Sequence, residues 1–183
     1  QNKIKIKDII FNKMNFNLNK ENYNFFRELL INDFSKFTLT IKNSNIFYKN
    51  DENDVLFINK INQLKYFYDF KDLENILSAN NEIFNIPYEI KLRDNQYKKQ
   101  IVSDISFDDF SLKFENYHNY KNPDTNGSVR LIHKQRKSEA SYNVNKGQFN
   151  FDYSDKSSKQ NFKYKGFINL KPFFSEFLGD INK

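Results

Sequence analysis

The stretch from Asn80 to Leu92, NNEIFNIPYEIKL, constrains the fold of this 183-residue chain more than any other. Large apolar residues recur there at every second position, namely Phe84, Ile86, Tyr88, Ile90 and Leu92. Polar residues and one proline stand between them. Because successive side chains of a strand point to opposite faces, this pattern predicts a β-strand with one apolar and one polar face. The apolar face needs either a second layer of protein or an apolar ligand.

The same alternation returns along the chain in short stretches separated by polar turns. The clearest are residues 37–41, 64–70, 101–107, 110–114, 149–153 and 162–170. Strands that recur roughly every ten to fifteen residues, with no helices between them, predict an antiparallel meander of about ten strands. The 21 Phe and 11 Tyr suit pleated, half-buried surfaces and favour the same mainly β class.

Three segments have helical spacing instead. Residues 20–32 place apolar side chains at i, i+3 and i+7 from Tyr23, which predicts a helix of about three turns near the N-terminus. Residues 72–80 predict one or two helical turns, and a short terminal helix is predicted from Phe173 onward. The first of these is the segment expected to cover part of the sheet.

Turn residues mark the expected connections between strands. The stretch Asn122–Gly127, which ends in Asn-Gly, predicts a hairpin turn, and Asp51–Asp54, Arg93–Asn95 and Asn145–Gln148 predict further turns. The apolar parity changes across Asp108-Asp109, which predicts a β-bulge or a break between two strands.

Catalytic and metal-binding patterns are absent from the sequence. There is no Cys, the two histidines are His118 and His133, and the four glycines form no phosphate-binding loop. The sequence therefore predicts a non-enzymatic protein that needs neither a metal nor another cofactor.

The formal net charge of +6 raises the alternative of a nucleic-acid partner. Its candidate basic patch consists of Arg130, Lys134, Arg136 and Lys137, with Tyr142 nearby for stacking on a single strand. Arginine is scarce in the rest of the chain, while Lys, Asn, Ile and Phe are abundant, as AT-rich codons produce. Nucleic acid is therefore the less favoured partner, and a β-rich surface or adhesion module that binds protein or glycan is a further alternative.

One predicted helix is little cover for so many strands, which is an argument for a curved, half-open sheet with an exposed groove. The residues alone leave this arrangement and a closed core equally open, and the family resemblance described below favours the groove. A closed β-sandwich or barrel, with the apolar face as ordinary core, is the alternative. The residues expected to line the apolar face are Phe84, Ile86, Tyr88, Ile90, Leu92, Phe110, Leu112, Phe114, Phe162, Tyr164 and Ile168.

Four segments of the sequence have residue patterns similar to those of one known family. They are Asn45–Tyr48, Val55–Asp72, Glu82–Tyr88 and the late phrase Gly166–Phe173, GFINLKPF. In these phrases the chain resembles segments of the AsmA-like superfamily, bacterial envelope proteins with long β-grooves. The resemblance covers most of the chain.

This resemblance implies a fold, a location and a function. The chain would be a single β-rich segment, residues 1–183, of a longer repetitive β-groove protein. That protein would be periplasmic and anchored to the inner membrane through a part outside this segment. Its groove would shelter phospholipid acyl chains for lipid transport or outer-membrane homeostasis, and other envelope proteins are possible partners.

Overall fold

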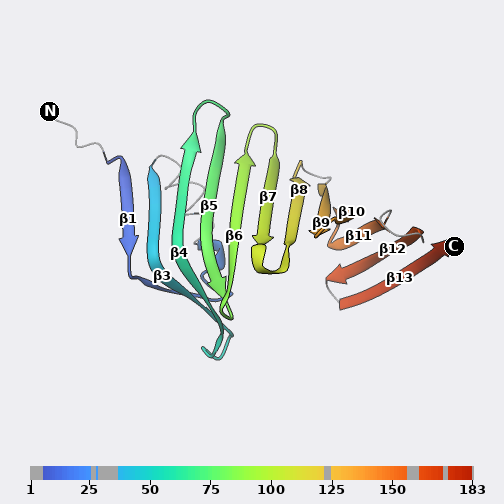
Figure 1. Cartoon of the computed structure of the whole chain (residues 1–183), viewed down its shortest axis with the longest axis horizontal. Helices are drawn as coiled ribbons and strands as arrows, with labels where there is room; N and C mark the ends of the chain where they lie inside the picture. The colour runs from blue at the N-terminus through green and yellow to red at the C-terminus, as the bar shows by residue number, and fades with distance from the viewer. Residues whose placement is uncertain are drawn as a thin grey trace. The chain divides into compact units, whose positions relative to one another are not determined.

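The computed structural model of the protein describes residues 6–25, 28, 37–121, 125–155, 161–170 and 173–182. Its strands are β1 (Asp8–Asn12), β2 (Asn15–Leu18), β3 (Thr38–Lys49), β4 (Val55–Asp69), β5 (Glu74–Ile83), β6 (Ile86–Asn95), β7 (Gln100–Phe107), β8 (Leu112–Asn119), β9 (Thr125–His133), β10 (Arg136–Asn145), β11 (Gln148–Asp155), β12 (Asn161–Leu170) and β13 (Phe173–Asn182). A short 3-10 helix, η2 (Asp108–Phe110), connects β7 and β8. The 13 strands form one open sheet that follows chain order from β3 to β13 (Figure 1). The predicted mainly β class is confirmed.

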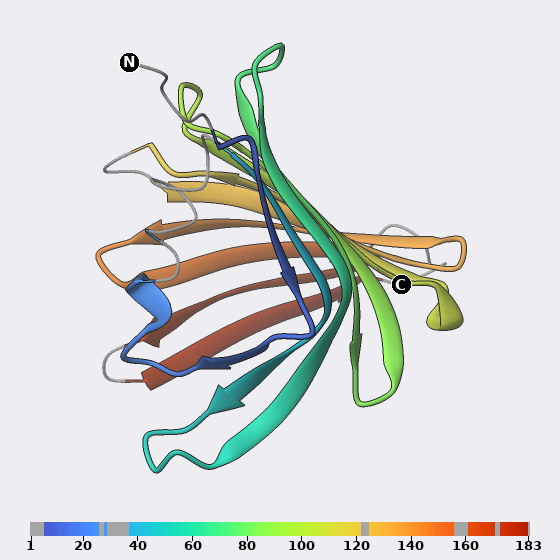
Figure 2. The same cartoon turned by 90° about the vertical axis from the view of Figure 1, so that its left-hand side faces the viewer.

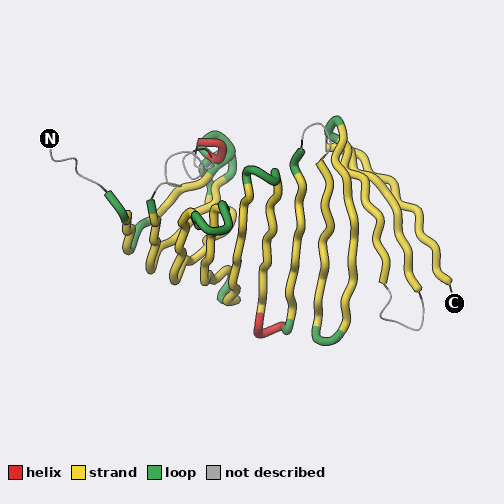
Figure 3. Tube along the Cα trace, turned by 90° about the horizontal axis from the view of Figure 1, so that it is seen from above, coloured by secondary structure: helices red, strands yellow, loops and turns green. Residues whose placement is uncertain are grey.

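The chain comprises two compact units, residues 1–93 and 94–183, which we call the N-terminal and C-terminal units. β3, β4 and β5 pair antiparallel in the first, and β7 to β13 pair antiparallel in the second. Figure 3 shows the strands of the C-terminal unit side by side in a single layer. The antiparallel meander is therefore confirmed, and the closed sandwich or barrel is not what the described residues form.

The first two strands depart from the meander, because both pair with β3 in parallel. β1 pairs with Thr38–Lys42, and β2 pairs with Asn45–Tyr48. Between these two segments Asn43 has a left-handed backbone with φ 49°. The Ser44 hydroxyl accepts a hydrogen bond from the Met14 amide at 3.0 Å and donates one to the Lys42 carbonyl at 2.7 Å. These bonds satisfy the backbone where pairing passes from β1 to β2.

The best-buried part of the N-terminal unit is a small core on one face of the long strands β3, β4 and β5. It contains Leu39, Ile61, Tyr66 and Ala79. The register sets Tyr66 opposite Leu39 and Leu77, so the core follows directly from strand pairing. β4, teal in Figure 2, bends along its length, and its pairing with β5 shifts register between Ile61 and Gln63.

A short helical turn precedes this core in the sequence. Residues 23–25 and 28 are helical, and the other residues of the predicted 20–32 helix beyond position 25 lie outside the described residues. Asn19 and Asn22 begin the turn with reciprocal backbone-to-side-chain bonds of 2.9 and 3.0 Å. Burial is the main cause that raises the pKa of Tyr48, and the nearby hydroxyls of Tyr88 and Tyr23 raise it further. The Tyr23 hydroxyl of the helical turn therefore lies near that of Tyr48 at the end of β3.

The prediction of one strand from Asn80 to Leu92 is wrong, because β5 ends and β6 begins within it. Phe84 and Asn85 form the turn, with φ 52° and 62°. Two residues with positive φ make the hairpin turn whose twist matches that of the strands. Phe84 is 73% exposed and lies outside the strands. Ile86, Tyr88, Ile90 and Leu92 do share one half-buried face of β6.

Other predicted elements are also wrong. The segment 72–80 is not helical, because Glu74–Asp69 pairing begins the β4–β5 hairpin, and hydrogen bonding to a neighbouring strand overrides helical spacing. β6 continues to Asn95, so the turn predicted at 93–95 lies instead at 96–99. Residues 173–178 belong to β13 and not to a terminal helix.

Candidate functional site

Pairing in the C-terminal unit sorts its side chains onto two chemically different faces. Residues directly opposite each other on neighbouring strands share a face. One face therefore carries the odd-numbered residues of β7, β9, β11 and β13 and the even-numbered residues of β8, β10 and β12. We call this the apolar face, because most of these residues are aliphatic or aromatic. The opposite parity forms the polar face.

The apolar face of the C-terminal unit is only partly covered. Every fully buried side chain among the described residues lies between Leu39 and Asn95. From position 96 onward the described side chains are half-buried or exposed, and Phe177 is 59% exposed. Its apolar residues therefore do not form a closed core within their own unit.

A hollow of about 570 Å³ lies on this apolar face. Its lining side chains are Val129, Ala140, Tyr142, Phe149, Phe151, Tyr153, Tyr164 and Phe177. Val129 and Ala140 are direct cross-strand partners and are the smallest side chains of the set. The small side chains of Val129 and Ala140 therefore form the floor of the hollow, and aromatic rings surround them.

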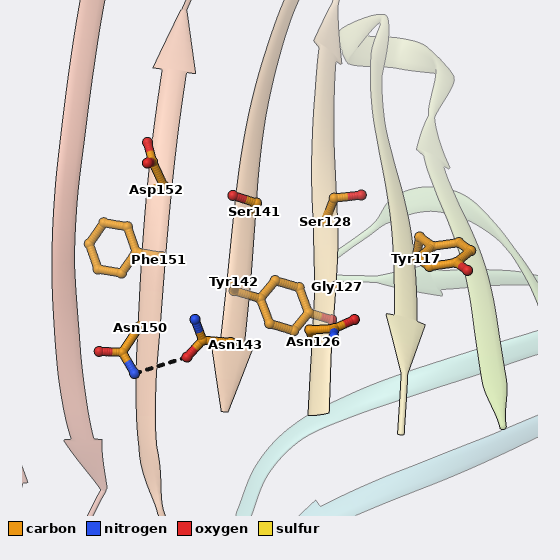
Figure 4. A pocket seen from close by; sticks show the side chains of 10 residues that line it. All are labelled: Tyr117, Asn126, Gly127, Ser128, Ser141, Tyr142, Asn143, Asn150, Phe151 and Asp152. Carbon is orange, nitrogen blue, oxygen red and sulfur yellow. Dashed lines mark hydrogen bonds between the residues drawn. The ribbon is translucent and has the colours of Figure 1, made fainter. Parts of the chain in front are cut away.

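Glycines let several of these rings lie against the sheet. A Cβ atom on Gly127 would stand 2.5 Å from Cζ and Oη of Tyr142, and one on Gly166 would stand 2.9 Å from Cζ of Phe151. Figure 4 shows the Tyr142 ring reaching from β10 toward Gly127 of β9. Gly179 has the same relation to the Tyr164 ring, whose Cδ1 and Cε1 would be 2.8 Å from its Cβ. The three rings thus lie over the glycines and add to the apolar surface. A side chain in place of each glycine would displace the ring above it.

A polar cluster borders the hollow on the same face. The Tyr142 hydroxyl donates to Oδ1 of Asn116 at 3.0 Å, and it lies 2.8 Å from Nδ1 of His118. Asn116 is the cross-strand partner of Val129, which lines the hollow. Burial raises the pKa of the Tyr142 hydroxyl, and the bond to Asn116 lowers it in part. We call Asn116, His118 and Tyr142 the polar cluster.

Aromatic rings extend in both directions from this cluster. His118 stacks with Tyr120 and Tyr142, at centroid distances of 6.4 and 5.9 Å. Tyr142 also stacks with Phe149 at 5.1 Å, so the rings lead from the cluster into the hollow. At the outer end, the Tyr120 hydroxyl donates to Oδ1 of Asp94 at 2.8 Å.

The bond between Tyr120 and Asp94 predicts a loss of stability in alkali. Burial, together with the Asp94 carboxylate, strongly raises the pKa of Tyr120 in the folded protein. An unfolded tyrosine ionises near pH ~10, so above that pH the unfolded chain releases a proton that folded Tyr120 retains. The Tyr120 contribution to stability is full below the unfolded pKa and decreases as pH rises above it. Urea unfolding at pH 9 and pH 11 should show the advantage of the wild type over Tyr120→Phe shrinking, whereas an unchanged advantage would contradict the assignment.

The polar face holds a second hollow, of about 560 Å³, shown in Figure 4. Its polar-face side chains are Tyr117, Asn126, Ser128, Ser141, Asn143, Asn150 and Asp152. Nδ2 of Asn150 donates to Oδ1 of Asn143 at 3.1 Å. This hollow is lined by neutral amides and hydroxyls, one carboxylate and aromatic rings, with no Lys or Arg among its lining residues.

Positive charge on the polar face is largely matched by carboxylates. Glu115 accepts from Lys113 at 2.8 Å and from Arg130 at 3.1 Å, and the bond from Lys113 is the main cause that lowers the pKa of Glu115. Arg130 also lies 3.8 Å from Glu139.

The predicted basic patch is not one surface. Arg130 and Lys137 lie on the polar face, whereas Arg136 has the parity of the apolar face. Lys134 lies in the β9–β10 turn with φ 55°. The predicted basic strand from Arg130 to Lys137 is therefore wrong, because this turn divides it.

The predicted lining residues are divided among three places. Leu112, Phe114, Phe162, Tyr164 and Ile168 share the apolar face of the C-terminal unit, as their alternation predicts. Phe110 lies instead in η2 and is 51% exposed, because the parity change at Asp108-Asp109 is a break between β7 and β8. Ile86, Tyr88, Ile90 and Leu92 belong to the N-terminal unit, where the Tyr88 hydroxyl donates to Oδ1 of Asn59 at 2.7 Å.

The sequence prediction did not include most of the hollow itself. Phe149, Phe151 and Tyr153 alternate visibly in the sequence, but only pairing shows that they meet Tyr142 and Phe177. Asn116 and His118 carry no motif, and their role depends on a strand register that no local pattern gives.

Comparison of the chain with protein-family models, curated proteins and solved structures finds no match. Among the described residues, no helix is long and apolar enough to cross a membrane. The same residues contain no group of three or more His, Cys, Asp or Glu side chains placed to hold a metal ion. Function is therefore argued from the two faces of the C-terminal unit.

Proposed function

We propose that the apolar face of the C-terminal unit shelters acyl chains of a lipid, as part of phospholipid transport or outer-membrane homeostasis in a bacterial envelope. The observation that carries this proposal is the aromatic hollow on a face with no fully buried side chain among its described residues. Apolar side chains that are grouped in this way and only partly covered support the binding of an apolar partner.

The chemistry and size of the hollow support an acyl chain as the ligand. Its volume of about 570 Å³ falls within the ~300–1,000 Å³ typical of small-molecule sites. Transfer of a methylene from water to an apolar site contributes about 0.8 kcal/mol. An acyl chain gains this at each carbon and needs no hydrogen-bond partner, which suits a lining of aliphatic side chains and ring faces.

The charge pattern disfavours the nucleic-acid alternative. Nucleic acid binding relies on unneutralised Lys and Arg near phosphates. On the polar face, Lys113, Arg130 and Lys165 each lie within 4 Å of a carboxylate. We therefore favour non-enzymatic lipid binding over nucleic-acid binding. The resemblance to AsmA-like segments adds the proposal of a periplasmic protein that is anchored to the inner membrane through a part outside this chain.

Site-specific photo-crosslinking tests this proposal with a control on the same strand. Phe151 lies on the apolar face of β11, and Asp152 lies next to it on the polar face. A photoreactive p-benzoylphenylalanine at position 151 should yield a phospholipid adduct, detected by mass spectrometry, because it replaces a ring that lines the hollow. The same group at position 152 should yield little or none.

Native mass spectrometry of the purified chain complements the crosslinks. A co-purified lipid is the expected result. The proposal fails if the chain has a ligand-free mass and positions 151 and 152 give equal yields of lipid adduct.

A further inference from the structure

The polar cluster lies beside the hollow, on a face that is mostly apolar. Its Asn116 also donates to the hydroxyl of Ser103, its cross-strand partner, at 3.5 Å. Asn116, His118 and Tyr142 hydrogen-bond to one another on the apolar face. Polar groups beside an apolar hollow usually fix the orientation of a ligand. A ligand at this position would need an atom of the cluster that is not already used in a hydrogen bond within it.

The hydrogen bonds fix the arrangement of protons in the cluster. The Tyr142 hydroxyl donates its hydrogen to Oδ1 of Asn116, so its oxygen can only accept from Nδ1 of His118. His118 therefore carries a hydrogen on Nδ1. Its Nε2 makes no hydrogen bond to any residue that the structure describes. With the hydrogen on Nδ1, this nitrogen carries a lone pair, so an anionic oxygen would meet it through a shared proton that the ligand or the solvent supplies.

The position of the cluster matches the end of a chain lying in the hollow. Tyr142 belongs both to the cluster and to the hollow lining. His118 stands opposite Gly127, whose missing side chain leaves the space that the Tyr142 ring occupies. Beyond His118, Nζ of Lys99 lies 5.9 Å from the centre of the Tyr120 ring, which stacks on the imidazole. A cation thus stands on the outer side of the cluster, while the hollow stands on the inner side.

The geometry points to the polar cluster as the site for the anionic headgroup of the sheltered lipid, with a proton shared between Nε2 of His118 and a phosphate or carboxylate oxygen. This assignment rests on the proposed lipid-binding function and adds the class of ligand, an acyl chain that ends in an anion. The Asn116–Tyr142 pair acts by holding the imidazole in place.

Three 16-carbon ligands with different headgroups test the assignment. Palmitate, hexadecyl phosphate and hexadecanol would each displace the neutral fluorophore N-phenyl-1-naphthylamine from the full chain, below the micelle concentration of each ligand. A hydrogen bond to a charged group should favour the anions over hexadecanol by about tenfold. Preference for hexadecyl phosphate alone would identify a phosphate headgroup, and preference for palmitate alone would identify a free fatty acid.

Variants separate the headgroup site from the hollow. His118→Leu should remove the anion preference and leave hexadecanol affinity within about twofold, because the leucine keeps an apolar side chain beside the hollow. Tyr142→Phe keeps the ring, so it should retain hexadecanol binding while it weakens the preference. His133→Leu is the matched control, since His133 has the same face parity on β9 but is exposed and lies away from the cluster. Circular dichroism would confirm that each variant folds.

The outcomes distinguish the two proposals. Equal affinity for all three ligands in wild type, unchanged in His118→Leu, would overturn the headgroup assignment and leave the lipid-binding function standing. Failure of every ligand to displace the fluorophore would overturn the lipid-binding function on which the assignment rests.

Discussion

Replacing Ile61 with alanine is expected to lower the free energy of unfolding by about 2–5 kcal/mol, the range for truncating a buried aliphatic side chain. Ile61 is the most deeply buried large side chain of the described core, at 1% exposure. Its cross-strand partners are Ser44 and Asn81, which are themselves buried and polar. Neither side chain can fill the space that the lost carbons would leave. The cavity should therefore remain, and its cost adds to the loss in the free energy of unfolding. Urea unfolding followed by circular dichroism measures the change.

The same strand offers a matched control. Ile58 lies three positions earlier on β4 and is 46% exposed. Ile58→Ala removes the same atoms from a position that is about half exposed, so it should cost clearly less than Ile61→Ala, about 1 kcal/mol. Equal costs at positions 58 and 61 would show that the N-terminal unit has no well-packed core around Ile61.

Strand parity was the part of the fold that could be predicted from the sequence. The alternation in β6, β8 and β12 correctly places Ile86, Leu112 and Tyr164 among the half-buried or apolar-face residues of their strands. The period of two is a local property of the backbone, so a single sequence contains it. The antiparallel meander followed from the absence of helices between such strands, whereas the residues alone left an open sheet and a closed core equally possible.

Turns were harder to predict because a two-residue turn can hide within an alternating pattern. Phe84 has the same parity as Ile86, yet its φ of 52° places it in the turn before β6. An aromatic residue is an unusual choice for a left-handed backbone, so its chemistry gives no turn signal. The Asn126-Gly127 pair misled in the opposite direction. It lies inside β9, where Gly127 is required by the close Tyr117 carbonyl and the Tyr142 ring and not by a turn. Residues 122–124 of the predicted turn lie outside the described residues.

The candidate site depended on register, which the sequence does not contain. His118, Gly127, Tyr142, Phe151, Gly166 and Phe177 form one continuous row of cross-strand partners across six strands. A shift of one residue in any pairing would move a ring to the polar face. The row therefore exists only after every hairpin has set its register.

Gly127→Ala is expected to lower the stability of the C-terminal unit by about 1–3 kcal/mol, the range for overpacking a well-filled position. The new Cβ would stand 2.3 Å from the Tyr117 carbonyl oxygen and 2.5 Å from the Tyr142 hydroxyl. Without a clash, alanine would stabilise a strand relative to glycine by roughly 0.5–1 kcal/mol. A net loss of stability would therefore mean that the clash costs more than this gain. Urea unfolding gives the stability. The displaced Tyr142 hydroxyl should also lose its bonds to His118 and Asn116, with a weaker anion preference in the ligand assay.

Gly179→Ala is the matched comparison, because its new Cβ would meet only the Tyr164 ring within 4 Å. That ring is 36% exposed and can rotate outward, so the substitution should cost less than about 1 kcal/mol. Removing the ring of Tyr142 should not rescue Gly127→Ala fully, since the contact with the Tyr117 backbone remains. Full rescue by Tyr142→Ala would mean that the ring alone requires the glycine, whereas equal costs at 127 and 179 would contradict the close strand approach at Gly127. In the proposed function this approach is important, because it lets Tyr142 both line the hollow and hydrogen-bond to the imidazole of His118.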